Sequence, residues 1–168
     1  YQLCKFFWEH SSEGRSLALI TVLSTEGSTY SKAGSQMLVN DEGDFQGMLS
    51  GGCLEGDLAE HSKLVIASGV AEVITYDLRA DDDVFGLGVG CEGALRILIQ
   101  SLNADAEYEP FASIVGELRH APRADMVRAS AESDLGVTRI VAPLRLLVLG
   151  AGQDADPLIT FAVALGWE

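Results

Sequence analysis

The sequence predicts an α/β protein with an N-terminal mixed-sheet domain, followed by the first βα unit of a truncated Rossmann-like domain. Short runs of apolar, β-forming residues alternate with segments whose apolar residues recur at helical spacing, which is typical of this class. Residues 145–165 have the order apolar run, glycine turn and helix, as in the first unit of a dinucleotide-binding domain. We therefore divide the chain into residues 1–103, a connecting segment 104–143, and residues 144–168.

The first part of the chain predicts a helix, a strand and a hairpin. Apolar residues near the N-terminus have helical spacing, which indicates a short helix. The apolar run 17–23 then indicates a buried strand that enters a polar loop over residues 24–35. Residues 37–39 and 45–49 flank a turn rich in Asn, Asp and Gly, which favours a β-hairpin.

One more helix and two strands complete the predicted N-terminal domain. Apolar residues at helical spacing run from Leu54 to a stop at Gly69. Cys53 therefore lies at or just before a helix N-terminus. Residues 71–76 and 94–99 are β-forming runs and predict strands.

The connecting segment and the last segment predict further elements. Residues 111–118 have one apolar helix face, and residues 126–131 and 137–142 favour strands that pair across residues 133–136. The run 145–149 predicts a buried strand. One βα unit cannot bury its own faces, so this unit must be disordered, packed onto the first domain or completed by further residues.

Composition limits the classes of partner. With 48% hydrophobic and 21% charged residues the chain is typical of a globular protein, and its net charge of −14 argues against non-specific nucleic-acid binding. Its apolar runs are shorter than the roughly 20 residues that span a bilayer, and we see no secretory leader, so we expect no membrane contact. Three cysteines do not suggest a disulfide framework, which favours a reducing cytoplasm.

Cys53 is the main candidate for chemistry because Gly51 and Gly52 precede it and a predicted helix follows it. Glycines allow positive φ and a close approach of the backbone, and a helix N-terminus favours thiolate over thiol. The alternative is a small buried residue in a turn whose glycines serve geometry alone. Glu55 is a candidate acid or base, or it favours the helix dipole from the first turn.

Weaker candidates lie elsewhere in the chain. Cys91 follows Gly90 in a second glycine string, whose backbone N–H groups could form an anion-binding concavity, with an irregular crossover loop as the alternative. Ser28 and Lys32 offer a hydroxyl and a cation directly after a buried strand, but no GxxxxGK[ST] motif is present. His61 lies on the apolar stripe of its helix and is interpreted as a packing residue with a satisfied ring.

Several strings agree in order and spacing with one family. They are EGST at 26–29, GSQM at 34–37, GGCLE at 51–55, TYD at 75–77, GVGCEG at 88–93, and the segment 145–167. Over nearly its whole length the chain resembles the XdhC/CoxI family, the accessory proteins that mature molybdenum hydroxylases such as xanthine dehydrogenase.

The resemblance implies a protein that binds the molybdenum cofactor (molybdopterin) and delivers it in sulfurated form to a xanthine dehydrogenase-type apo-hydroxylase in the cytoplasm. It also implies a cysteine desulfurase as the source of sulfur, and it allows a homodimer. Soft thiolate ligands suit such a centre, so Cys53 and Cys91 are expected to contact molybdenum or relay sulfur. The glycine loops would receive the pterin phosphate.

The chain departs from the usual family pattern in two places. Pro-Arg usually follows the Gly-Ser-Thr/Ser string, where this chain has Tyr30, Ser31 and Lys32. An anion contact by that arginine therefore passes to Lys32 or is lost. Glu92 replaces the first of two glycines after Cys91, which weakens the prediction of an anion-binding concavity there.

Two other functions stay open at this point. One is a NAD(P)-linked, thiol-dependent oxidoreductase or redox sensor, in which the turn at Gly150 and Gly152 binds the dinucleotide. It predicts nicotinamide-dependent turnover, whereas a chaperone predicts stoichiometric transfer of a cofactor. The other is a structural docking module with an acidic face.

Overall fold

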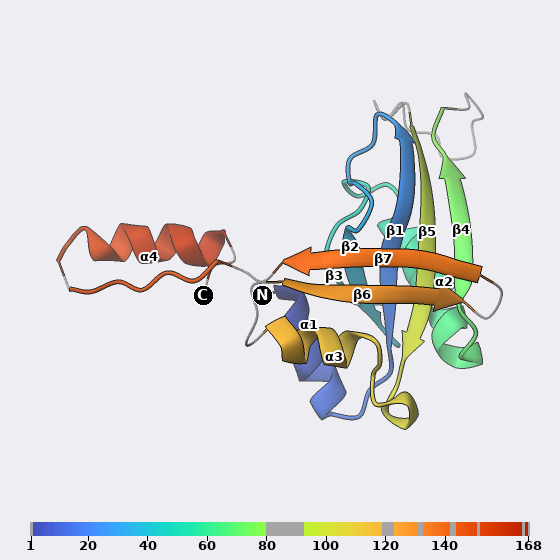
Figure 1. Ribbon diagram of the computed structural model, residues 1–168, viewed down its shortest axis with the longest axis horizontal. Helices are drawn as coiled ribbons and strands as arrows, with labels where there is room; N and C mark the ends of the chain where they lie inside the picture. Colours follow the sequence, from blue (N-terminus) through green and yellow to red (C-terminus); the bar gives the residue numbers. More distant parts are fainter. Residues whose placement is uncertain are drawn as a thin grey trace.

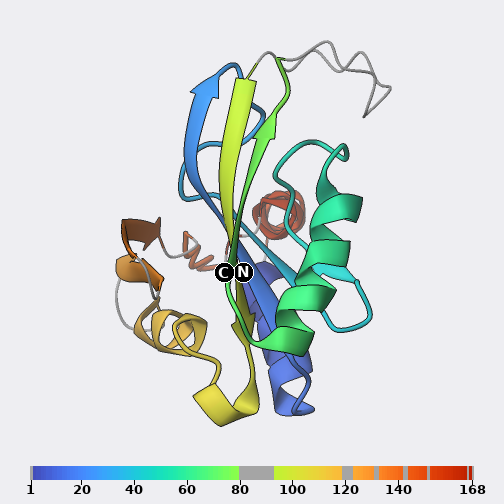
Figure 2. The same ribbon diagram turned by 90° about the vertical axis from the view of Figure 1, so that its right-hand side faces the viewer.

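The computed structural model describes residues 2–79, 93–118, 123–130, 133–141, 144–150, 152–165 and 167. A five-stranded sheet is covered by α2 on one face and by α1 and α3 on the other (Figures 1 and 2). In chain order the elements are α1 (Gln2–Ser12), β1 (Leu17–Gly27), β2 (Gln36–Asn40), β3 (Phe45–Gln46), α2 (Glu55–Ser68), β4 (Glu72–Asp77), β5 (Gly93–Leu102), the 3-10 turn η1 (Ala104–Ala106), α3 (Phe111–Leu118), β6 (Arg123–Ser130), β7 (Ser133–Val141) and α4 (Ala155–Ala164).

The predicted α/β class is confirmed, and the strands of the main sheet have the order β3-β2-β1-β5-β4. Every pairing in this sheet is antiparallel, where the sequence predicted a mixed sheet. The predicted hairpin forms from β2 and β3, but β3 is only two residues long. It ends before Gly47, whose φ of 108° takes the chain out of the strand.

The sheet separates two apolar cores because successive side chains of a strand point to opposite faces. On the α2 side the core includes Ile20, Met37, Leu58, Ile97 and Ile99. The second core lies on the other face, where alternate residues of β1 and β5 pack against α1 and α3. Its fully buried members come from the strands and its aromatic ones from the two helices.

Helix α2 has the start and the stop that the sequence predicts. Leu54 is its N-cap, and Gly69 ends it in the left-handed region with φ of 70°, donating its N–H to the Val65 carbonyl. Leu58 and Val65 are buried on the inner face. The predicted packing position of His61 is only partly correct, since its ring reaches the surface and its Nδ1 lies 3.0 Å from a Glu72 carboxylate oxygen.

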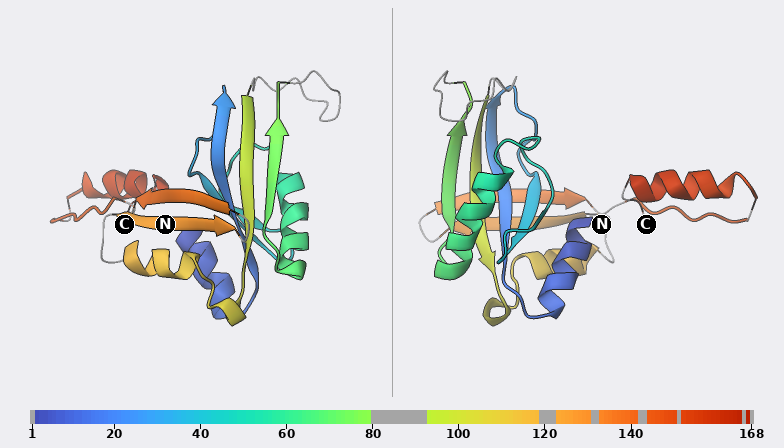
Figure 3. Two further views of the ribbon diagram at one scale, coloured as in Figure 1. Left: turned by 45° about the vertical axis from the view of Figure 1, so that its right-hand side comes forward. Right: turned by 180° about the vertical axis from the view of Figure 1, so that it is seen from behind.

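The predicted helix over residues 111–118 and the predicted second hairpin are both present. Strands β6 and β7 pair antiparallel, with Ser130 opposite Ser133. Residues 133–136, which the sequence assigned to the turn, belong to β7, where Ser133 and Asp134 pair with Ser130 and Ala129. Figure 3 shows this hairpin crossing in front of the main sheet as a separate layer.

The predicted buried strand at residues 145–149 is wrong. Residues 144–150 form no strand, and Leu147 and Leu149 are 81% and 88% exposed. A strand needs a neighbour to accept and donate its backbone hydrogen bonds, and no strand of either described sheet pairs with this run. Helix α4 does form where the sequence predicts it, and it lies apart from the main sheet (Figure 3).

None of the helices among the described residues is both long enough and apolar enough to cross a bilayer. The division into domains and the Rossmann-like identity of the last segment stay predictions.

A single glycine holds the start of β5 against the end of β1. A Cβ atom built on Gly93 would lie 2.5 Å from the Glu26 carbonyl oxygen and 2.6 Å from that of Ser28. We expect Gly93→Ala to lower the free energy of unfolding by about 1–3 kcal/mol, the usual cost of overpacking, in urea denaturation. The control is Gly56→Ala in α2, where the added Cβ meets no atom within 4 Å and stability should be equal or higher. Equal stability of Gly93→Ala and wild type would contradict this packing.

Candidate functional site

The segment between β3 and α2, residues 47–54, forms the loop that carries the predicted thiol, and we call it the Cys53 loop. Gly51 and Gly52 have φ of 77° and 111°, a region that side-chain-bearing residues rarely adopt. The two glycines reverse the chain at the surface and return it to the helix start. Cys53 is followed by the N-cap Leu54, which confirms its predicted place just before a helix N-terminus.

The carboxylate of Glu55 organises this loop from within. The residue is 3% exposed, and its oxygens accept hydrogen bonds from the backbone N–H groups of Leu49, Ser50 and Gly52 at 2.8, 2.8 and 2.9 Å. The Ser50 hydroxyl donates a further one. Burial raises the pKa of Glu55, but these hydrogen bonds outweigh it and leave the pKa below its ordinary value.

Ser50 connects the carboxylate to the helix. Its hydroxyl donates to Glu55 and accepts from the backbone N–H of Leu54 at 2.7 Å. The serine thus satisfies one of the N–H groups that a helix N-terminus leaves without an intrahelical acceptor. Ser50 was not among the predicted site residues, and it lies too far before α2 to match the N-cap signal, which places a serine directly before the first helical residue.

The Cys53 loop packs against the loop between β1 and β2, residues 28–35, which we call the Tyr30 loop. The buried Ser31 hydroxyl donates to the Leu49 carbonyl at 2.7 Å. The ring of Tyr30 lies alongside Gly51, 3.4 Å from where a Cβ would be, and the tyrosine is 62% exposed. No sequence signal points to either contact, since both join loops that are far apart in the chain.

The predicted cation Lys32 is turned toward its own loop. Its Nζ lies 3.4 Å from the Thr29 carbonyl oxygen and 3.5 Å from the Thr29 hydroxyl, which in turn donates to the Ser31 carbonyl. Lys32 is exposed, so these contacts leave its ammonium accessible to solvent. The carbonyl of the predicted residue Ser28 faces Gly93 instead.

The surface of the Cys53 loop offers a thiol and two hydrogen-bond donors. Cys53 is partly buried and packs against the core on the α2 side, while Gly51 and Gly52 are exposed. Within the described part of the chain, the backbone N–H groups of Gly51 and Cys53 have no acceptor, whereas those of their neighbours are bound. The arrangement can bind a ligand that combines a soft metal with anionic oxygens.

The other predicted site residues either lie outside the described residues or belong to the last segment of the chain. Cys91 and Gly90 lie outside the described residues, as does Glu92. Gly150 and Gly152 precede α4, which lies away from the Cys53 loop (Figure 3). Among the residues described, no three or more His, Cys, Asp and Glu side chains are grouped to hold a metal ion. Cys53 therefore offers a single sulfur ligand there.

The part of the chain that contains this loop matches a known protein family. Residues 10–77 match the model of the XdhC and CoxI family. This range contains both the Tyr30 loop and the Cys53 loop, and over these residues the match confirms the resemblance predicted from the sequence.

Two curated relatives and one solved structure match the chain more widely. A Bacillus subtilis (strain 168) protein, named as a probable subunit of xanthine dehydrogenase, is 27% identical over 188 residues, covering 89% of this chain and 57% of its own. The Escherichia coli (strain K12) protein named molybdenum cofactor insertion chaperone PaoD is 22% identical over 181 residues, covering 99% and 55%. A Bacillus halodurans crystal structure described as a xanthine dehydrogenase has a TM-score of 0.76 at 22% identity, covering 96% of this chain and 59% of that one. The chain thus spans little more than half the length of these relatives, and the structural likeness shows the fold alone.

Replacement of Glu55 by Gln should destabilise the protein because the amide nitrogen would face backbone donors. We expect a loss of about 2–4 kcal/mol in urea denaturation at pH 7, from one or two donors left without an acceptor. The control is Glu60→Gln on the outer face of α2, whose exposed ion pair with Lys63 should contribute less than about 1 kcal/mol.

The same variant should change the dependence of stability on pH. Because folding lowers the pKa of Glu55, its stabilisation is complete above the ordinary value of 4.5 and is lost as pH falls through the lower folded value. Wild type should therefore lose stability relative to Glu55→Gln as pH falls below 4.5. If the free energies of unfolding of wild type and Glu55→Gln differed by the same amount from pH 7 down to pH 2, this role of Glu55 would be contradicted.

Proposed function

We propose that this chain, whose residues 10–77 match the XdhC and CoxI family, binds the molybdenum cofactor and delivers it to a xanthine dehydrogenase-type apo-hydroxylase. The observation that supports the proposal is the Cys53 thiol, held beside two backbone N–H groups that have no acceptor in the described part of the chain. We expect a stoichiometric transfer of cofactor and no catalytic turnover.

The Cys53 loop contains a group suited to the metal of the cofactor and groups suited to its anionic oxygens. Thiolate is a soft ligand and suits the metal centre, while the N–H groups of Gly51 and Cys53 can donate to anionic oxygens. The exposed glycines let a bulky ligand approach the backbone closely. One protein ligand in place of a full cage is also appropriate for a carrier, because a cargo that is coordinated weakly can be released to the client.

The charges around the loop are compatible with an anionic ligand despite the acidic composition. The carboxylate of Glu55 points inward and is saturated by donors, so it does not face the ligand. The next acidic residue, Asp57, accepts a hydrogen bond from the Tyr76 hydroxyl at 2.6 Å. Lys32 is an exposed cation on the Tyr30 loop, which packs against the Cys53 loop, and the anion contact of the family arginine either passes to Lys32 or is lost.

The names of the relatives support the class of cargo and client. PaoD is named a molybdenum cofactor insertion chaperone, and the name of the Bacillus subtilis relative refers to xanthine dehydrogenase. Delivery in sulfurated form, with sulfur from a cysteine desulfurase, belongs to the proposal, as do a homodimer and a cytoplasmic location. A contact of Cys91 with the cofactor also stays a prediction.

Replacement of Cys53 by Ala should abolish retention of the cofactor because it removes the one sulfur ligand of the loop. After incubation with purified cofactor and gel filtration, we expect the molybdenum content per protein to fall about tenfold or more, as for loss of a metal ligand. The matched control is Cys4→Ala on α1, which removes the same group from a helix away from the Cys53 loop and should leave retention unchanged. Melting temperatures of both variants show whether they fold.

The outcome separates the proposal from its competitors. Wild-type retention by Cys53→Ala, together with unchanged activation of an apo-hydroxylase, would overturn the role of the thiol. Nicotinamide-dependent turnover by the protein would instead favour the NAD(P)-linked oxidoreductase.

A further inference from the structure

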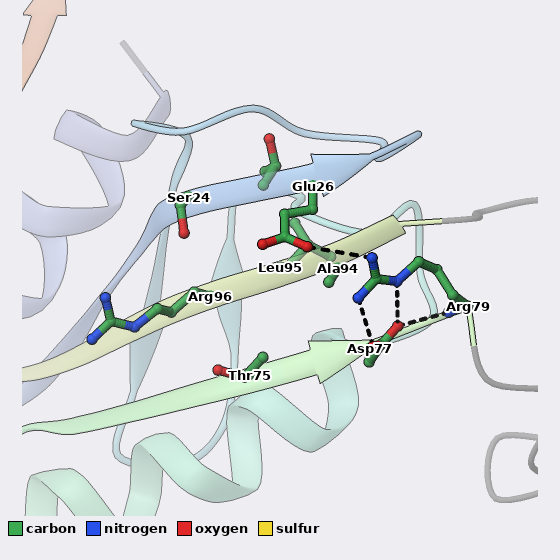
Figure 4. A pocket seen from close by; sticks show the side chains of 9 residues that line it. Ser24, Glu26, Thr75, Asp77, Arg79, Ala94, Leu95 and Arg96 are labelled. Carbon is green, nitrogen blue, oxygen red and sulfur yellow. Dashed lines mark hydrogen bonds and ion pairs between the residues drawn. The ribbon is translucent and has the colours of Figure 1, made fainter.

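A depression in the surface of the sheet contains no residue of the Cys53 loop and has no role in the proposed function. It has a volume of about 180 Å³ and is lined by residues from the end of β1, the end of β4 and the start of β5 (Figure 4). Leu95 and Ile97 on β5 belong to the core under α2, so Arg96 between them points to the opposite face. Figure 4 shows its side chain on that face, with α2 behind the sheet.

Arg96 is flanked by two hydroxyl residues in one row across three strands. The pairing register places Ser24 of β1 on one side of Arg96 and Thr75 of β4 on the other. A β-bulge between Val22 and Ser24 brings Ser24 into this register. The guanidinium of Arg96 has five N–H donors, and each of the two hydroxyl groups has one O–H donor. The three side chains can therefore all donate hydrogen bonds to one ligand.

The next row contains two carboxylates, and Arg79 binds both. Its guanidinium donates to Asp77 at 2.8 and 2.9 Å and to Glu26 at 3.3 Å, across the small residue Ala94. The hydrogen bonds from Arg79 lower the pKa of Asp77 to about 2, so this carboxylate is ionised at neutral pH. Arg79 therefore compensates the acidic side of the depression, and Ala94 leaves the space beside it open.

Arg96 has no counter-charge among the described residues. Within the part of the chain that the structure describes, neither a hydrogen bond nor an ion pair joins its guanidinium to another residue. The chain has eleven Lys and Arg against twenty-five Asp and Glu, and yet none of the described carboxylates is paired with Arg96. Arg96 is one of the residues that line the depression, and its side chain extends over the sheet with the guanidinium directed away from Arg79 and Asp77 (Figure 4).

We propose that Arg96, Ser24 and Thr75 form a binding site for an oxyanion, a phosphate monoester or a carboxylate. The guanidinium matches the planar, two-oxygen edge of either group, and the flanking hydroxyls donate to the remaining oxygens. The carboxylates held by Arg79 border the site and favour a ligand that also carries a hydrogen-bond donor. This site lies on the face opposite α2 and is independent of the cofactor proposal.

Titration of the 168-residue chain with inorganic phosphate, and separately with acetate, tests the site by NMR. We expect saturable shifts of the Arg96 side-chain Nε–H and of the Ser24 and Thr75 amides. Arg96→Gln should weaken binding about tenfold or more, as expected for loss of a charge-assisted pair. Lys5→Gln is the control, since it removes the same charge from the exposed α1 ion pair with Glu9 and should bind as wild type does.

A change in the opposite direction adds a second test. Glu26→Gln removes a carboxylate beside the site and should tighten binding of the same probe, which a misfolded variant would not do. Shifts with both probes support a general oxyanion site, and shifts with phosphate alone support a phosphate monoester. The absence of saturable shifts in wild type, or equal dissociation constants for wild type and Arg96→Gln, would overturn the proposal. Cofactor retention by Arg96→Gln separates the two sites, because the variant should retain molybdenum normally.

Discussion

The buried carboxylate of Glu55 is the interaction on which the candidate site depends. A charge that is 3% exposed is costly to desolvate unless hydrogen bonds replace its water, and here three backbone N–H groups and one hydroxyl do so. These donors come from the last residues before the glycine turn and from the turn itself. The Glu55 side chain therefore fixes Leu49 and Ser50 before the glycines, the path of the glycines and the start of α2. Cys53 lies between these fixed points, so its position follows from theirs.

Direct contacts also connect the Cys53 loop with the Tyr30 loop and with the start of β5. Ser31 donates to the Leu49 carbonyl, and the Tyr30 ring covers Gly51, so the two loops constrain each other. The Tyr30 loop in turn begins beside Gly93, where the backbones of β1 and β5 approach too closely for a side chain. A chain of direct contacts thus connects the first residue of β5 with the thiol loop. Each contact involves a backbone atom, which explains why small residues and glycines recur there.

The sequence predicted the regular elements well because their signals are local. Helix α2, its stop at Gly69 and the place of Cys53 follow from apolar spacing and one glycine. The strand predicted at residues 145–149 failed because an apolar run shows that burial is favourable and does not supply a neighbour to pair with. The sequence favoured a dipole role for Glu55, since its contacts with the preceding loop have no sequence period. Arg96 was missed for a similar reason, because its isolation is apparent only when Arg79 is seen to occupy both carboxylates.

The strong negative charge of the chain does not prevent two anion-binding sites of the kinds proposed. At physiological ionic strength the Debye length is about 8 Å, so most of the charge of −14 is screened at the distance of either site. What remains is the balance of nearby groups, and at each site the nearest carboxylates already have donors: Glu55 within its own loop, and Asp77 with Glu26 on Arg79. The groups left over are donors, namely two N–H groups at one site and a guanidinium at the other. An acidic protein can therefore bind an anion at a site where the nearby carboxylates already accept hydrogen bonds from the protein and where N–H donors face the ligand.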